Sequence, residues 1–349
     1  MMADTPTPFV LAADIGGTNT NLAVMDGDRI LFSRRYATGA DPSPEAALLC
    51  FLSEADASSV PRPTLSCVCG AGLVRDGVIR MSNAAWILDQ AAIAASLGMP
   101  CFLINDFSAV AWGILTLHAD RDDELAVLRR PDGSFAHGDP WGPMVALGAG
   151  TGLGCAWTTR DGGRPRVYPS EGGHVSIPVY DDQSERLASW LKARYSRPAG
   201  VEAAVSGQGL ANIFLFLSGV DAHPTQTSLD ILSQPESRRP ALIAAAAGSD
   251  SLCARAMTMF VELYARTAAN MALAFMPSGG IYLAGGVAAK NLAWFTDGAL
   301  FMRNFLDSYR EHTRAILEDT PVYVVRNYDI SLVGASYAAR VLSGAEDSA

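Results

Sequence analysis

Two glycine-rich segments carry residue types that can bind phosphate. The first follows an apolar run ending at Asp14 and contains Gly16, Gly17, Thr18 and Asn19. The second, at residues 147–154, repeats the order of apolar run, glycines, threonine and apolar run. Glycine N–H groups let a ligand approach the backbone closely. One such turn fits an ordinary hairpin equally well, but two of the same kind could hold a triphosphate from both sides.

Neither segment matches the common phosphate-binding loops. No lysine follows the glycines, which excludes a P-loop, and a strand rather than a helix is expected next, which excludes a dinucleotide fingerprint. A third glycine pair, Gly285 and Gly286, follows an apolar run that starts at residue 279. There an adenine or ribose ring could lie flat against the backbone.

An amide and an acid follow a further apolar run. Asn105 and Asp106 come directly after Phe102-Leu103-Ile104 and are predicted to lie at the carboxyl end of a strand, where α/β proteins bind ligands. Asp106 could instead cap the next helix. We expect Ser108 to be the cap, which leaves Asp106 free for chemistry.

Three more polar side chains are candidates. Glu171 and His174 flank two glycines, and a carboxylate and an imidazole on one tight turn suit hydrogen bonding to vicinal hydroxyls. A zinc site would need further ligands nearby, and the sequence offers none there. Taken alone, Glu202 is interpreted as an ordinary first-turn acid of an apolar helix.

Alternating strands and helices are expected to position these residues. In the first third, strands are predicted at 9–14, 20–26, 29–37, 64–72 and 101–107, and helices at 43–55, 87–98 and 108–117. Three strands with glycine turns follow between residues 143 and 173. After them, strands are predicted at 279–287 and 321–326, and helices at 182–194, 208–217, 228–234, 239–246, 251–275, 297–316 and 331–342. Both halves begin with hairpin-linked strands and then alternate, which favours two similar α/β lobes related by duplication.

Bulk properties limit the class of protein. A chain of 349 residues is too long for one ordinary core, so two domains are expected. Hydrophobic residues make up 49% of the chain and charged residues 18%, which is typical of a well-packed protein. The net charge of −10 argues against nucleic acid as a partner, but not against nucleotides, whose phosphates backbone amides can hold.

The compartment is expected to be the cytoplasm. No uninterrupted apolar run is long enough to span a membrane, and no positively charged segment precedes the first apolar run, so we expect neither a membrane protein nor a signal peptide. Of the six cysteines, only Cys67 and Cys69 are close in sequence, and their spacing suits a buried strand. Reduced thiols are therefore expected.

Taken in order, the motifs resemble those of the bacterial glucokinase family, within the hexokinase–actin–Hsp70 ATPase group. They are "DIGGTN", "SNAAW", "INDFSAV", "GAGTGLG", "EGGHV", "EAAVSGQGL" and "LAGGV", and they cover residues 9 to about 337. The resemblance implies a two-lobed actin-like ATPase (ribonuclease H-like) α/β fold with the active site in the interlobe cleft. It also implies a small lobe of residues 1–117 and 332–349 and a large lobe of residues 118–331.

The resemblance implies a role for each matching residue. Asp106 would be the catalytic base, and Asp14 would orient Mg²⁺ through water. The sugar would be held by Asn105, Glu171, His174 and Glu202. The ATP would be held by Gly16, Gly17, Thr18 and Asn19, by Gly150, Thr151 and Gly152, and by Gly285 and Gly286.

The expected activity is ATP-dependent phosphorylation of D-glucose to glucose 6-phosphate, the first step of glycolysis. The alternatives are a hexokinase-like enzyme with another or broader preference, such as mannose or glucosamine, and a non-catalytic actin-like ATPase or sugar sensor. The chain departs from the family pattern at Ser176, where an Asp is common, and at Gln208, where a Pro is frequent; both lie outside the sugar-binding set. The Cys-rich zinc motif of the related ROK kinases is absent after His174. A homodimer is expected, with neither nucleic acid nor membrane as a partner.

Overall fold

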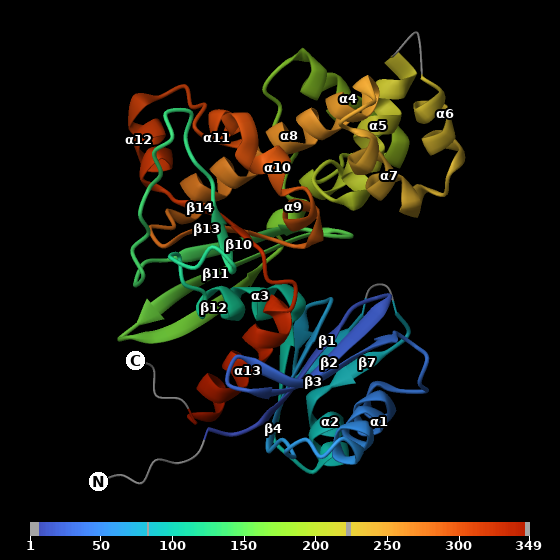
Figure 1. The fold of residues 1–349 in the computed structure, drawn as a ribbon, viewed down its shortest axis with the longest axis vertical. Helices are drawn as coiled ribbons and strands as arrows, with labels where there is room; N and C mark the ends of the chain where they lie inside the picture. Colours follow the sequence, from blue (N-terminus) through green and yellow to red (C-terminus); the bar gives the residue numbers. More distant parts are fainter. Residues whose placement is uncertain (1–6, 82–83, 221–224, 346–349) are drawn as a thin grey trace. The chain divides into compact units, whose positions relative to one another are not determined.

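The computed structural model describes residues 7–81, 84–220 and 225–345. The chain divides into two compact units (Figure 1). The first unit comprises Met1–His118, Thr158–Pro169 and Asn327–Ala349, and the second comprises Ala119–Trp157 and Ser170–Arg326. The lobe boundaries expected from the sequence stay a prediction. Ser82 and Asn83 of the "SNAAW" motif lie outside the described residues.

A five-stranded sheet of order β3-β2-β1-β4-β8 forms the centre of the first unit. Its hairpin-linked strands are β1 (Val10–Ile15), β2 (Asn19–Asp26) and β3 (Arg29–Ala37), which pair antiparallel. Strands β4 (Leu65–Gly70) and β8 (Cys101–Asn105) continue the sheet in parallel from β1. The strands predicted in this region are confirmed to within a few residues, because buried strands appear in the sequence as short apolar runs.

Helices cover both faces of this sheet, so alternate residues of β1 enter different cores. Leu11, Ala13 and Ile15 pack with residues of α1 (Pro44–Ala57) and α2 (Gln90–Leu97). Val10 and Ala12 pack instead with α3 (Asp106–Ile114) and α13 (Ile330–Ser343). Because strand side chains alternate with a period of two, Asp14 continues the second set and lies on the face covered by α3 and α13.

A small three-stranded sheet in the first unit differs from the prediction. Residues 87–89 were expected to begin a helix, but Ile87–Asp89 forms β7, which pairs with β6 (Val78–Arg80), and β6 pairs in turn with β5 (Val74–Arg75). The helix begins only at Gln90, where the Asp89 carboxylate accepts hydrogen bonds from two backbone N–H groups. Pairing of Leu88 with Ile79, both buried, therefore makes residues 87–89 a strand and not the first turn of the helix.

A six-stranded sheet of order β12-β11-β10-β13-β14-β9 contains the strands of the second unit, and residues 158–169 of its strands β11 and β12 are assigned to the first unit. Strand β10 pairs parallel with β13, β13 pairs parallel with β14, and β9 pairs antiparallel with β14. The strands are β9 (Leu125–Val127), β10 (Met144–Ala149), β11 (Leu153–Asp161), β12 (Arg164–Ser170), β13 (Gly280–Ala284) and β14 (Val322–Val325). Both sheets thus contain three hairpin-linked strands followed by parallel ones, in agreement with the predicted similarity of the two halves.

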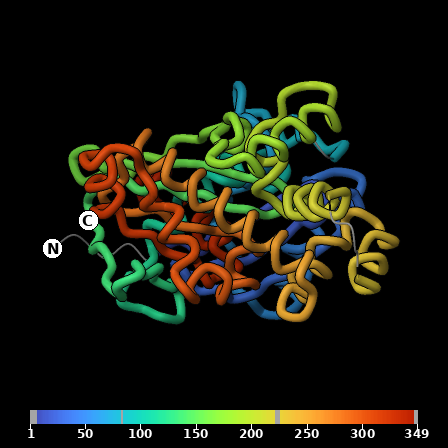
Figure 2. Tube along the Cα trace, turned by 90° about the horizontal axis from the view of Figure 1, so that it is seen from above, coloured from blue at the N-terminus to red at the C-terminus, as the bar shows by residue number. Residues whose placement is uncertain are grey.

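The long helix α8 (Ser251–Phe275) organises the core of the second unit. It packs beside α5 (Gly207–Val220) and α11 (Leu300–Phe305), and its run is easily followed in orange in Figures 1 and 2. Most of its length is buried, so it is a core helix. The other helices here are α4 (Asp182–Tyr195), α6 (Gln226–Ser233), η3 (Glu236–Arg238), α7 (Arg239–Ala246), α9 (Gly286–Lys290), α10 (Leu292–Thr296), η4 (Asp297–Ala299) and α12 (Glu311–Asp319).

One predicted helix of the second unit is broken. Residues 297–316 were expected to form a single helix, but Gly298 and Ala299 have φ values of 61° and 55°. A right-handed helix cannot continue through the left-handed region. The segment is therefore divided among η4, α11 and α12.

Two further sequence expectations concern the whole chain. All six cysteines are free, and five of them are buried, including Cys67 and Cys69 on β4. Among the described residues, no helix combines the length and the apolar character needed to span a membrane.

Candidate functional site

In the first unit, the parallel strands bring the candidate acids to one edge of the sheet. Asp14 on β1 is level with Cys69 on β4, and Gly70 of β4 is level with Asn105 at the end of β8. Asp106 is the next residue and begins α3. The prediction that Asn105 and Asp106 emerge at the carboxyl end of a strand is therefore confirmed.

Asn105, not Ser108, caps α3. The Asn105 side-chain oxygen accepts hydrogen bonds from the N–H groups of Phe107 and Ser108, at 2.9 and 3.1 Å, and its backbone is extended, as a cap requires. Ser108 lies inside the first turn, so the expectation that it is the cap is wrong. The outcome for Asp106 is unchanged, because Asp106 is the first helical residue and does not cap the helix.

The Asp106 carboxylate is oriented through one of its oxygens. Oδ1 accepts hydrogen bonds from the side-chain amide of Asn105 and from the N–H of Phe107, both at 2.9 Å. The Asn105 amide also donates to the carbonyl of Gly72 at 3.1 Å, so Asn105 links the acid to the backbone that follows β4. This arrangement fixes the direction of Asp106, and among the residues that the structure describes none donates a hydrogen bond to its Oδ2, which a ligand can therefore reach.

Burial raises the pKa of both acids. Burial raises the pKa of Asp106 to about 6, and the nearby Asp14 adds to the shift, while the N–H of Phe107 opposes it. Burial also raises the pKa of Asp14, and the Ser331 hydroxyl opposes this by donating to Oδ2 at 2.7 Å. Asp106 can therefore accept and release a proton close to neutral pH.

The first glycine turn joins β1 to β2 in the same unit. The N–H of Gly16 donates to the carbonyl of Asn19 at 2.9 Å and closes the turn. Thr38, at the end of β3, donates from its hydroxyl to the Gly16 carbonyl at 2.7 Å and from its N–H to the Thr18 carbonyl at 3.0 Å. The turn is thus held by the strand beside it, and Thr18 is exposed at its tip.

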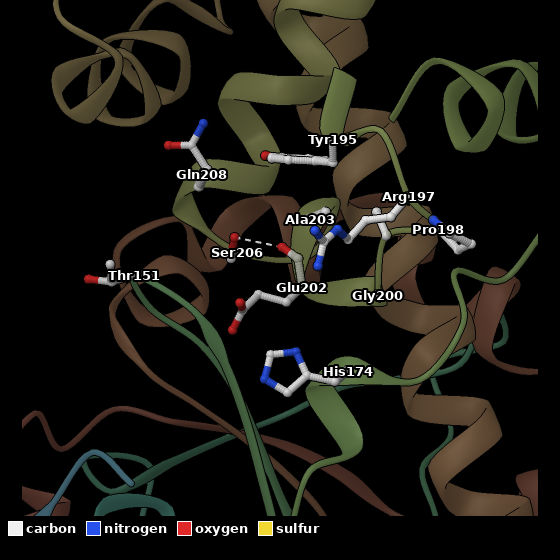
Figure 3. Close-up of a pocket in the computed structure, with 11 residues that line it drawn as sticks. Thr151, His174, Tyr195, Arg197, Pro198, Gly200, Glu202, Ala203, Ser206 and Gln208 are labelled. Carbon is white, nitrogen blue, oxygen red and sulfur yellow. Dashed lines mark hydrogen bonds between the residues drawn. The ribbon is translucent and has the colours of Figure 1, made fainter. Parts of the chain in front are cut away.

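In the second unit, a pocket of about 510 Å³ is lined by the end of α4 and the residues that follow it, by the start of α5, and by three further segments (Figure 3). These three segments are the turn at residues 150–153 between β10 and β11, the turn at residues 171–174 after β12, and the segment at residues 200–207 before α5. Each segment supplies at least one predicted site residue. The lining residues are Thr151, His174, Tyr195, Arg197, Pro198, Ala199, Gly200, Glu202, Ala203, Ser206 and Gln208.

Glu171 and His174 face each other, in agreement with the predicted pair on a tight turn. The glycines between them and His174 form the short 3₁₀ helix η1 (Gly172–His174), and Nε2 of His174 lies 3.5 Å from Oε2 of Glu171. Both side chains are exposed and can reach a ligand. Gly173 lies so close to β11 that an added Cβ would be 1.9 Å from the carbonyl oxygen of Leu153, so only glycine allows this turn to pack there.

Glu202 is not a first-turn acid of α5, so that interpretation is wrong. It lies in the separate 3₁₀ helix η2 (Val201–Ala203), and α5 starts only at Gly207. The start of η2 is held by the N–H of Val201, which donates to the carbonyl of Val175 at 2.8 Å. The Glu202 carboxylate is half-buried and accepts a hydrogen bond from the N–H of Leu153 at 2.8 Å. Glu202 therefore contacts the turn at residues 150–153 and lines the pocket.

The third glycine pair lies beside the second turn. Strand β13 ends at Ala284, level with Gly148 of β10, so the strand predicted to reach residue 287 is shorter than expected. Gly285 has a φ of 88° and packs against the carbonyl of Ala149, and Gly286 starts α9. The parallel pairing of β10 with β13 therefore brings Gly285 next to the Gly150 turn.

Residues that the sequence analysis did not single out also contribute. Arg197 lines the pocket and points into it in Figure 3. Ser331, which hydrogen-bonds Asp14, comes from the final helix. No local pattern marks these side chains, because each reaches its site through tertiary contacts.

Comparisons with known proteins match nearly the whole chain to one family. The glucokinase family model matches residues 11–342. A glucokinase of Nostoc sp. is 32% identical over 350 residues, covering 95% of this chain and 98% of the relative. Among solved structures, glucokinase from Balamuthia mandrillaris in complex with glucose has a TM-score of 0.76 at 23% identity, covering 95% of this chain and 94% of that one. A ROK family glucokinase from Streptomyces griseus in complex with glucose and AMPPNP has a TM-score of 0.62 at 21% identity, covering 95% and 99%.

The fold and the site define the class of protein. Two sheets of similar strand order, each with a glycine turn after the first of its hairpin-linked strands, form the two-lobed actin-like ATPase fold that glucokinases and ROK sugar kinases share. Within that class, the chain belongs to the glucokinase family.

Proposed function

We propose that this protein transfers the γ-phosphoryl group of ATP to the 6-hydroxyl of D-glucose, giving glucose 6-phosphate and ADP. Membership of the family and 32% identity to a glucokinase over nearly the full length support the activity. The related structures that hold glucose and AMPPNP support the substrates. One observation in this chain carries the proposal. It is the half-buried Asp106 carboxylate, oriented through Oδ1 at the carboxyl edge of a parallel sheet.

In the proposed mechanism, Asp106 is the catalytic base. It accepts a hydrogen bond from the 6-hydroxyl and takes the proton late, because a carboxylate with a pKa of about 6 is a weak base towards an alcohol. The sugar oxygen forms a bond to the γ-phosphorus while the bond to the β–γ bridging oxygen breaks, and ADP leaves. Positioning of the hydroxyl and the phosphate supplies most of the rate enhancement.

The remaining predicted residues are assigned to binding. Glu171, His174 and Glu202 would hydrogen-bond the sugar hydroxyls, with Asn105 beside Asp106. The glycine turns at residues 16–19 and 150–152 would hold the phosphates through backbone N–H groups, and Gly285 with Gly286 would contact the adenosine.

The residues present fit a magnesium ion held mainly by the nucleotide. Among the described residues, no cluster of three or more His, Cys, Asp or Glu side chains could hold a metal ion without other ligands. Mg²⁺ is commonly bound by one or two carboxylates, water and substrate phosphates, and Asp14 offers a carboxylate at the right sheet edge. When bound, the ion neutralises charge on the β- and γ-phosphates. Asp14, held by Ser331, would orient it through water.

Glucose-dependent formation of ADP is the direct test of the proposed function. ADP should form from Mg·ATP only when glucose is present, and glucose 6-phosphate should form in equal amount. Equal ADP formation with and without sugar would instead indicate an actin-like ATPase. Faster turnover of mannose or glucosamine would indicate a hexokinase-like enzyme with a different preference.

Acidification is expected to abolish activity as Asp106 becomes protonated. A base must be ionised to work, so kcat/KM for glucose should fall about tenfold per pH unit below the Asp106 pKa of about 6. Protonation of Asp14, whose pKa is also raised, would steepen the fall. A rate profile from about pH 5 to about pH 8, with circular dichroism to verify folding, measures this. A flat profile down to about pH 5 would contradict the assigned base.

Removing the imidazole of His174 is expected to weaken sugar recognition. A His174→Ala variant should lose roughly tenfold or more in kcat/KM for glucose, because a sugar hydroxyl that is buried on binding without its partner costs about 1–3 kcal/mol. The loss should be smaller for the deoxy sugar that lacks the hydroxyl contacted by His174. Kinetics with a series of deoxyglucoses measure this, and an equal loss for every deoxy sugar would contradict a specific contact.

We also propose that the protein is a cytoplasmic homodimer. The proposal rests on the family resemblance, because α8 is mostly buried within its own unit and offers little surface for a partner. Light scattering of the purified protein tests the oligomeric state, and a monomer at all concentrations would contradict it.

A further inference from the structure

The turn at residues 150–153 is fixed at both ends by the segment at residues 200–207. At one end, the N–H of Leu153 donates to Oε2 of Glu202 at 2.8 Å. At the other end, the N–H of Gly207 donates to the carbonyl of Gly150 at 2.8 Å. The segment that carries the proposed sugar ligand Glu202 therefore also holds the proposed phosphate turn.

The Glu202 carboxylate is seated closely against this turn. An added Cβ on Gly152 would lie 2.4 Å from Oε2 of Glu202 and 3.2 Å from its Cδ, so glycine leaves the space that the carboxylate fills. The backbone of Glu202 is anchored as well, because the hydroxyl of Ser206 donates to its carbonyl at 2.8 Å, as drawn in Figure 3. The same hydroxyl accepts the N–H of Gly209 at 2.9 Å.

The same carboxylate also faces the pocket. Glu202 lines it together with Thr151 and His174, and Figure 3 shows Glu202 and His174 pointing into it. A carboxylate has acceptor sites on both oxygens, so Oε2 can keep the N–H of Leu153 while Oε1 accepts a ligand hydroxyl. One side chain can thus serve a sugar and the turn at once.

We propose that Glu202 is a positioning residue for the nucleotide, in addition to its sugar contact, because its carboxylate sets the conformation of the turn at residues 150–153. The inference rests on the proposed function, since it assigns this turn to phosphate binding. A turn that loses this acceptor must reorder before its N–H groups can bind phosphate. Glu202 would therefore affect nucleotide binding even in the absence of sugar.

Two substitutions at residue 202 separate the acceptor from the charge. In Glu202→Gln, the amide oxygen can still accept the N–H of Leu153, whereas Glu202→Ala removes the acceptor. Binding of Mg·ADP to the sugar-free protein, measured by calorimetry, should weaken at least about fivefold in the alanine variant. In the glutamine variant it should stay within about twofold of the wild type or become tighter, since a negative charge near the phosphates is lost.

Gly152 and Glu185 provide the matched variants. Gly152→Ala should displace the Glu202 carboxylate and therefore weaken glucose binding, although Gly152 is assigned only to the nucleotide. Glu185→Ala removes an exposed carboxylate from α4 and should leave both affinities unchanged. Thermal unfolding of each variant shows that the fold is kept.

The outcomes distinguish the inference from the proposed function. Wild-type protein that forms no ADP from ATP and glucose would refute the proposed function. Active wild-type protein whose Glu202→Ala variant binds Mg·ADP as tightly as the wild type would refute the positioning role alone. Equal weakening in the alanine and glutamine variants would also refute it, because the loss would then follow the charge and not the acceptor.

Discussion

Replacing Asp106 with asparagine is expected to lower kcat at least about 100-fold while glucose still binds. The amide oxygen can still accept the N–H of Phe107 that now orients the carboxylate, so the side chain should keep its position. An amide cannot take the proton of the 6-hydroxyl, so the loss should fall on kcat and leave the affinity for glucose within a fewfold of the wild type. Steady-state kinetics and calorimetry with glucose measure the two separately.

The control for this substitution is Asp56→Asn, which makes the same change at an exposed position on α1. It should turn over at the wild-type rate. Near-normal turnover of Asp106→Asn would remove Asp106 from the catalytic role. A loss of glucose affinity as large as the loss of kcat would assign Asp106 to binding.

The Gly173→Ala substitution is expected to lower kcat/KM for glucose about 100-fold, because a displacement of roughly 1 Å in a binding group can cost that much. The added Cβ would lie 1.9 Å from the carbonyl oxygen of Leu153, which belongs to the backbone and cannot rotate away. The turn that carries Glu171 and His174 must therefore move. Kinetics with glucose, together with thermal unfolding, measure this effect.

Gly219→Ala is the matched control, because an added Cβ there meets no atom within 4 Å. It should leave glucose kinetics unchanged. If Gly173→Ala folds and binds glucose within about twofold of the wild type, the turn at residues 171–174 does not hold the sugar.

Local patterns in the sequence predicted most elements that carry the site. Buried parallel strands appear as apolar runs, and a glycine turn or a polar pair after such a run marks the strand end where ligands bind. For this reason Asp14, Asn105 and Asp106 could be placed at strand ends, and Glu171 with His174 on one turn. Their types and local order are properties of short segments, so no tertiary information was needed.

The boundaries of helices and strands were less predictable where two local structures are both compatible with the sequence. Asn105 and Ser108 are both good capping residues, and the end of β8 at Asn105 decided between them. Residues 87–89 continue the apolar pattern of the helix that follows, but pairing with β6 makes them a strand. Such choices depend on neighbours distant in the sequence, which propensity does not include.

The sequence by itself determined the family of this protein and the chemical groups at its site, because these depend on residue types and their spacing. Only the tertiary structure showed that Ser331 donates to Asp14, 317 positions away, and that Glu202 accepts the N–H of Leu153, 49 positions away. The first contact forms because α13 packs against the face of β1. The second forms because η2 packs against the turn before β11. Packing of this kind arises only when the whole chain folds, because each contact joins segments that no local pattern connects.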